Sequence, residues 1–112
     1  MRKIVYAGST FYTGDLLAEA LLEYAAALAR ADTAATIFIP ALDENGTRGE
    51  IELLVGPASQ LATQPSDGDW PEVVDDVALV RLRTLTAELA PLLPTFEPPF
   101  QGGEWDESDD LR

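Results

Sequence analysis

The sequence contains neither cysteine nor histidine, and these two absences exclude several kinds of chemistry. Without cysteine, the chain has no disulfide framework, thiolate metal site or thiol nucleophile. Without histidine, it lacks the side chain that most often serves as general base, metal ligand or pH switch near neutrality. We therefore expect no metal and no cofactor, and any catalysis would have to use hydroxyls or carboxylates.

Long apolar runs are missing as well. No stretch approaches the roughly 18 apolar residues needed to cross a bilayer. The chain starts with a basic pair, Arg2 and Lys3, but only the short run from Ile4 to Ala7 follows it. A secretory signal needs an apolar region of roughly 7 to 15 residues. We therefore expect a cytoplasmic protein with no membrane partner.

Basic residues are few, with 7 Lys and Arg against 20 Asp and Glu, for a net charge of −13. The imbalance grows along the chain: residues 1–64 hold eight acids and four bases, whereas residues 65–112 hold twelve and three. Such a surface repels phosphate groups, so we expect no nucleic-acid partner. A basic protein is the partner that this charge favours, although the same charge also serves solubility.

The length of 112 residues suits one domain. We place that domain at residues 1–90 and read residues 91–112 as a C-terminal extension, first Pro-rich and then acidic. The extension also holds apolar side chains that we expect at an interface, namely Phe96, Phe100 and Trp105. We expect residues 92–100 to pack against the domain and residues from about 102 onward to be mobile.

Local patterns predict an α/β domain of two layers, in the order β-α-β-β-α. The expected strands and helices are, in chain order, 3–7, 14–31, 36–42, 50–55 and a helix from about residue 70 to residue 90. We interpret residues 9–13 as a loop, 57–61 as a single helical turn and 64–68 as a polar linker. The result would be a three-stranded mixed sheet, with a right-handed parallel crossover from the first strand to the second.

The register of the hairpin formed by the last two strands follows from its loop. Residues 43–47 suit a type I turn in which Gly46 takes the left-handed conformation. That loop pairs Ile39 with Ile51 and Ile37 with Leu53, which places all four side chains on one core face.

The first helix is apolar almost all round, so it must be buried almost all round. One of its stripes consists of Leu17, Leu21, Tyr24 and Leu28. A second stripe is rich in alanine, which permits close helix approach, and we predict that it forms the contact of a homodimer through Ala18, Leu22, Ala25 and Ala29.

The second helix is expected to open with a capping box formed by Asp69 and Glu72. Its apolar stripe would then consist of Val74, Ala78, Leu82, Leu85 and Leu89.

Residues 8–14 lie between a predicted strand and a predicted helix, where phosphate-binding loops often occur. Asp15 stands where such a loop needs a lysine, and its carboxylate would repel a phosphate. If a small ligand binds there, we expect it to be neutral or cationic. The candidate ligand-binding residues are Ser9, Thr10, Tyr12 and Thr13, although loop and cap chemistry also explains them, with Thr13 as the helix cap.

These observations leave three hypotheses for function. The first is a non-catalytic protein-interaction domain that self-associates. The second is a small enzyme or small-molecule binder that uses the Gly8–Gly14 loop, for which the sequence offers no separate catalytic residues. The third is an acidic decoy that occupies a basic or nucleic-acid-binding protein.

Overall fold

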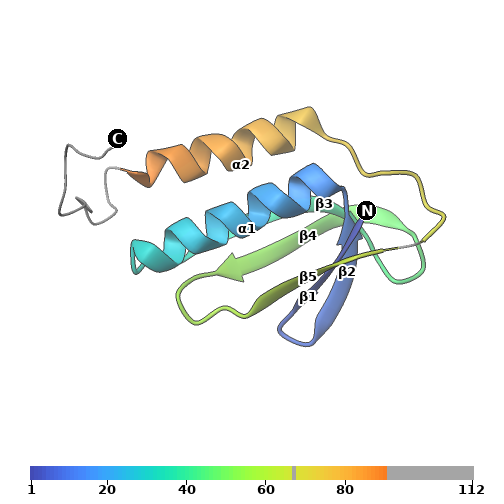
Figure 1. Ribbon diagram of the computed structural model, residues 1–112, viewed down its shortest axis with the longest axis horizontal. Coiled ribbons are helices and arrows are strands. Elements are labelled where there is room, and N and C mark those ends of the chain that lie inside the picture. Colours follow the sequence, from blue (N-terminus) through green and yellow to red (C-terminus); the bar gives the residue numbers. More distant parts are fainter. Residues whose placement is uncertain (67, 91–112) are drawn as a thin grey trace, which may run out of the picture.

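The computed structural model of the chain describes residues 1–66 and 68–90. These residues form five strands and two helices, in the order β1 (Arg2–Tyr6), β2 (Ser9–Thr13), α1 (Asp15–Arg30), β3 (Ala35–Leu42), β4 (Arg48–Val55), β5 (Leu61–Pro65) and α2 (Asp76–Glu88). Both helices lie on the same side of the sheet, and α2 packs along α1 (Figure 1). The α/β class predicted from the sequence is confirmed. The predicted extension at 91–112, with Phe96, Phe100 and Trp105, lies outside the described residues.

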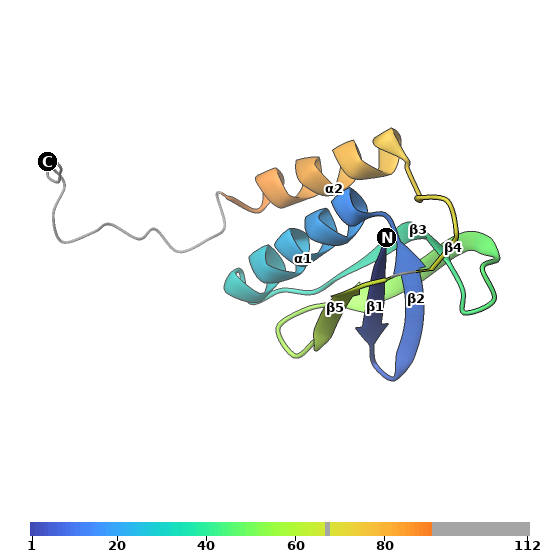
Figure 2. The same ribbon diagram turned by 45° about the vertical axis from the view of Figure 1, so that its right-hand side comes forward.

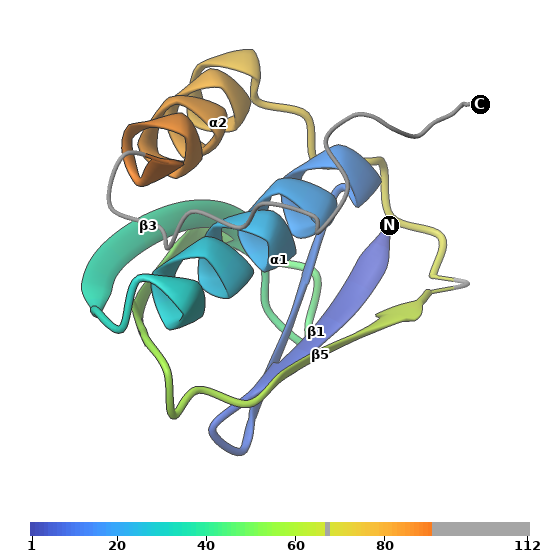
Figure 3. The same ribbon diagram turned by 60° about the vertical axis from the view of Figure 1, so that its left-hand side comes forward.

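The sheet is antiparallel throughout the described residues, with the strand order β4-β3-β2-β1-β5. Strands β2 and β3 share a single pair, Tyr12 with Leu42. Elsewhere the two strands diverge, and the sheet is strongly curled (Figure 3). Because of this curl, the Tyr6 hydroxyl on β1 reaches the carbonyl of Leu54 on β4, although two strands lie between them in the sheet order.

The prediction of a three-stranded mixed sheet is wrong, and the first reason is a tight turn after β1. Ala7 and Gly8 both take positive φ angles, 51° and 81°, and Tyr6 pairs directly with Ser9 across them. A two-residue turn of this kind matches the twist of a hairpin. Residues 9–13 therefore return as strand β2 instead of forming a loop. Alanine rarely takes this conformation, so a turn at Ala7 and Gly8 was not expected from these residues.

The predicted parallel crossover is wrong for the same reason. Strand β2 inserts between β1 and β3, so these two strands never pair. A further strand, β5, occupies part of the region interpreted as a helical turn and a polar linker. It pairs with the other edge of β1, where Ile4 lies opposite Thr63. Strand β1 thus satisfies its backbone hydrogen bonds on both sides, which a buried strand requires.

The predicted register of the β3–β4 hairpin is confirmed. Ile39 pairs with Ile51 and Ile37 with Leu53, and Gly46 has a φ of 82°. The carboxylate of Asp43 closes the loop by accepting hydrogen bonds from the backbone N–H groups of Asn45 and Thr47, at 2.8 and 3.0 Å. The core face of this hairpin lies under α1.

Helix α1 buries its predicted stripe of Leu17, Leu21, Tyr24 and Leu28. The expectation that Thr13 caps this helix is wrong. The cap position is Gly14, which has no side chain to accept a hydrogen bond from the first turn. Thr13 is instead buried at the end of β2, where its hydroxyl donates to the carbonyl oxygen of Pro40 at 2.8 Å.

Helix α2 begins at Asp76, later than predicted. Its cap is Asp75, whose carboxylate accepts a hydrogen bond from the backbone N–H of Ala78 at 3.0 Å. The predicted capping box of Asp69 and Glu72 is therefore wrong. Of the predicted stripe, Leu82 is buried, Ala78, Leu85 and Leu89 are partly buried against the core, and Val74 precedes the helix and is exposed.

We predict that Gly46→Ala lowers the free energy of unfolding by about 1–3 kcal/mol, because a non-glycine residue at positive φ is strained. A Cβ atom at this position would also lie 2.6 Å from Nε1 of Trp70. Urea unfolding measures the change. Gly49→Ala is the matched control, since a Cβ atom there meets nothing within 4 Å. Equal stability of the two variants would contradict the prediction.

Candidate interaction surfaces

The predicted ligand-binding residues lie on strand β2 and do not converge. Strand alternation places Thr10 and Tyr12 on one face of the sheet and Ser9 and Thr13 on the other. Thr13 is fully buried, and Tyr12 packs edge-on against Trp70, with ring centroids 5.0 Å apart. Their assignment as a ligand site remains a prediction, and Ser9 and Thr10 line a hollow on the surface.

That hollow, of about 360 Å³, lies between the start of β2 and the loop of the β3–β4 hairpin. Ser9 and Thr10 line one side, and Asp43, Glu44 and Asn45 line the other. The carboxylate of Asp43 already holds the loop together through two backbone hydrogen bonds. Within residues 1–66 and 68–90, no group of three or more Asp or Glu residues is arranged to hold a metal ion.

A larger hollow, of about 600 Å³, lies where the ends of β1 and β4 meet the loop before β5. Its polar groups are engaged with one another: the Tyr6 hydroxyl donates to the Leu54 carbonyl and lies 3.1 Å from the Ser59 hydroxyl. Ser59 also accepts a hydrogen bond from the backbone N–H of Gly56 at 2.9 Å. No charged side chain lines this hollow. These contacts close the gap between β1 and β4.

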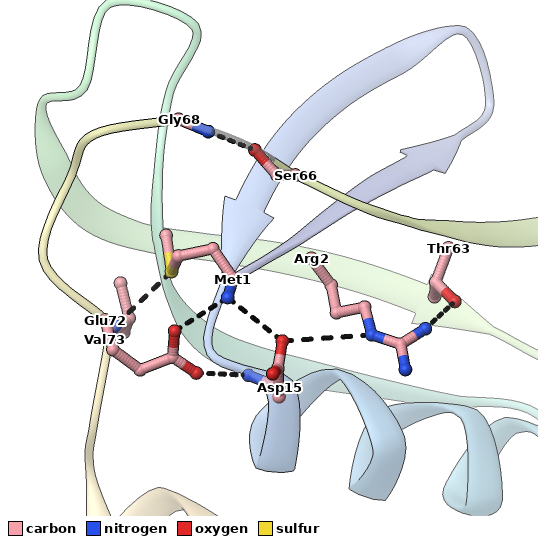
Figure 4. A network of polar contacts seen from close by, with 8 residues as sticks. All are labelled: Met1, Arg2, Asp15, Thr63, Ser66, Gly68, Glu72 and Val73. Carbon is pink, nitrogen blue, oxygen red and sulfur yellow. Dashed lines mark hydrogen bonds and ion pairs between the residues drawn. The ribbon is translucent and has the colours of Figure 1, made fainter.

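The N-terminal amine of Met1 stands at the centre of a polar network (Figure 4). It lies 2.7 Å from the carboxylate of Glu72 and 3.0 Å from that of Asp15. Glu72 also accepts a hydrogen bond from the backbone N–H of Asp15, at 2.6 Å. The hydrogen bonds to Glu72 and then Asp15 raise the pKa of the amine above its ordinary value of 8.0. The network joins the start of β1, the start of α1 and the segment that leads to α2.

The predicted dimer residues on α1 are divided between the interior and the surface. Ala18 is buried, Leu22 and Ala25 are half-buried, and Ala29 is exposed. Helix α2 packs along α1 within one chain (Figure 2). A contact between copies through these four residues remains a prediction.

The exposed side of α2 carries an apolar stripe that the sequence analysis did not identify. Val77 and Val80 are 81% and 61% exposed, and Thr84 and Ala87 continue the same face at spacings of seven residues. We call these four residues the α2 outer face. The apolar run from Val77 to Val80 was the available signal, but the helix was expected to start six residues earlier, and its expected apolar stripe faced the core.

The α2 outer face has charged residues on both flanks. Asp76 and Arg83 follow one side, and Arg81 and Glu88 follow the other, so the flanks are neutral in sum. None of these four residues forms an ion pair within the part of the chain that the structure describes.

A second exposed apolar area lies on the face of the sheet that the helices do not cover. Phe38 on β3 and Leu54 on β4 are 55% and 63% exposed. Their neighbours on the same face of β4 are Glu50 and Glu52, both exposed. The confirmed register of the β3–β4 hairpin places these four residues on its outer surface, opposite the core face.

Comparison with known proteins gives no match: no family model fits the chain, and no curated protein or solved structure is significantly similar to it. Within the described ranges, neither helix has the length and apolar character needed to cross a membrane. Function therefore has to be argued from the surfaces of this chain.

We predict that the stability of the protein falls as the pH rises above 8. The pKa of the Met1 amine is raised in the folded state, so its contribution is complete below its unfolded value of about 8 and is lost as the pH passes the folded value. Thermal unfolding between pH 7 and pH 9.5 would show this loss. The range stays below the pKa of Tyr24, which burial raises above 10.0.

Glu72→Gln is the control, because it keeps an acceptor for the amine and removes the charge. The loss of stability between pH 7 and pH 9.5 should be smaller in this variant. An identical pH dependence in the two proteins would show that the network does not couple to the amine.

Proposed function

We propose that the protein is a non-catalytic interaction domain that self-associates as a twofold dimer through the α2 outer face. The observation that carries this proposal is the exposure of Val77 and Val80, at 81% and 61%, on a helix that packs against α1 on its other side. A helix with apolar side chains on both sides needs a partner on both sides. Contiguous exposed apolar surface of this kind is typical of sites where proteins associate.

The spacing of the α2 outer face supports helix-to-helix contact. Val77, Val80, Thr84 and Ala87 follow the pattern i, i+3, i+7 and i+10, which is the seam of a coiled coil. Ala87 and Thr84 are small enough to allow close approach near the end of the helix. The stripe covers about three turns, nearly the whole of α2.

The charges beside the stripe support a second copy as the partner. In an antiparallel pair, Asp76 faces Arg83 of the partner subunit, and Arg81 faces Glu88 of the partner subunit. In a parallel pair, Asp76 faces the partner's Arg81, and Arg83 faces the partner's Glu88. Either orientation therefore sets acid against base. The repulsion between two chains of net charge −13 is largely screened beyond about 8 Å at physiological salt.

We propose this surface in place of the alanine-rich stripe of α1, because Ala18 is buried and Leu22 and Ala25 are half-buried within the chain. The small-molecule hypothesis has weaker support, since the candidate residues of β2 point to opposite faces. The decoy hypothesis stays a prediction. Twofold dimers need only one self-complementary surface, which makes this the simplest assembly.

We expect the full chain to sediment as a dimer, at twice its mass of 12.1 kDa, with dissociation on dilution. The double substitution Val77→Asp and Val80→Asp should give a monomer, because it places charge at the centre of the apolar stripe. Val74→Asp is the control, since Val74 is 66% exposed but lies outside α2. A wild-type chain that stays at 12.1 kDa at every concentration would refute the proposal.

Charge exchange then distinguishes the two orientations. Arg83→Glu should weaken the dimer in both cases. Adding Asp76→Arg should restore an antiparallel dimer, whereas adding Glu88→Arg should restore a parallel one.

A further inference from the structure

Strand β4 forms one end of the sheet and has an open side. Its eight residues, Arg48–Val55, pair with β3 over their whole length. No other strand among the described residues pairs with β4. An end strand of this length presents backbone N–H and C=O groups with which another chain can pair.

Two hydrogen bonds show which residues of β4 point outward. The Pro40 carbonyl accepts from Thr13 on β2, so the backbone of Pro40 faces away from β4. Pro40 lies opposite Glu50, and opposed residues of an antiparallel pair face each other or face apart together. The backbone of Glu50 therefore points out of the sheet. The Leu54 carbonyl accepts from Tyr6, which gives the same direction for Leu54.

Glu52 lies between these two positions, so its backbone groups also point outward. The Tyr6 hydroxyl already occupies the Leu54 carbonyl, and this contact closes the end of the open side. The free part of the edge is thus centred on Glu50 and Glu52. Their N–H and C=O groups have no hydrogen-bond partner within residues 1–66 and 68–90.

The same two residues carry negative charge on the sheet face that the helices leave uncovered. Both side chains are exposed, and neither forms an ion pair in the described parts of the chain. Their cross-strand neighbours, Pro40 and Phe38, are uncharged, and Arg48 is the one base on the same face of β4, so this edge carries a net charge of −1. Phe38 and Leu54 extend this area with exposed apolar surface.

These charges select the occupant. If two copies paired in the register centred on the free part of the edge, Glu50 of one would face Glu52 of the partner subunit, and opposed like charges destabilise a strand pair. An extended segment with basic residues two positions apart would place both cations beside the two glutamates, while its backbone pairs with theirs. We propose that the outer edge of β4 binds such a basic, extended segment of a partner protein as an additional strand.

This site is independent of the α2 outer face, which lies on the other side of the molecule (Figure 1). A direct probe is a peptide of alternating Lys and Val, equal in length to β4 and labelled for fluorescence anisotropy with the full chain. Its lysines share one face when it is extended. We expect binding, and slower amide hydrogen exchange at Glu50 and Glu52 in the complex.

Two matched controls separate strand pairing from general attraction between opposite charges. Glu50→Lys with Glu52→Lys should weaken binding by about tenfold or more, because it replaces attraction with repulsion. Glu19→Lys with Glu23→Lys changes the net charge equally on exposed positions of α1 and should have a much smaller effect. A peptide with N-methylated central amides, which keeps all its lysines, should also bind more weakly.

Equal effects of the two pairs of substitutions, or undiminished binding of the N-methylated peptide, would overturn the proposal. So would the absence of binding at low salt, where charge attraction is strongest. The monomeric variant Val77→Asp with Val80→Asp should bind the Lys–Val peptide as tightly as the wild type. This result separates failure of the β4 site from failure of the proposed dimer.

Discussion

Helix α1 carries apolar side chains on more than one side, and the requirement to bury them arranges the rest of the molecule. The sheet and α2 together bury Leu17, Leu21, Tyr24 and Leu28. Because the sheet must curve around this helix, its far strands approach each other, and Tyr6 on β1 meets Leu54 on β4. Covering α1 leaves α2 as the outermost layer, with its own apolar side exposed.

The two surfaces proposed for association differ in charge, and this difference assigns them different partners. The α2 outer face has equal numbers of acidic and basic residues beside it, so it can face a copy of itself. The open edge of β4 carries Glu50 and Glu52 with Arg48 as the one base on the same face, so its net charge is negative and attracts a cation. A strongly acidic protein can in this way self-associate through one surface while reserving another for a basic partner.

Glu72 illustrates how a contact distant in sequence redirects a local signal. Its spacing from Asp69 is typical of a capping box, yet its carboxylate binds the Met1 amine and the backbone N–H of Asp15. Those donors belong to the starts of β1 and α1, and together they offer a positive amine and an unsatisfied helix N–H. Hydrogen bonds to these two donors stabilise the Glu72 carboxylate more than capping a helix that starts near Trp70 would. Helix α2 therefore begins later, after Asp75.

The sequence by itself determined the features that depend on neighbours along the chain. These are the register of the β3–β4 hairpin, set by Gly46 and the alternating isoleucines, and the existence and buried stripe of α1, set by its helical period. Strand β2 could not be predicted, because Ala7 takes its positive φ only where pairing with β1 compensates the strain. The residues of β5 show only a weak strand pattern. They form a strand because the backbone N–H and C=O groups on the second side of β1 need hydrogen-bond partners. Both proposed surfaces depend on tertiary structure. The α2 outer face depends on which side of α2 packs on α1, and the β4 site depends on which backbone groups of β4 the sheet leaves unpaired.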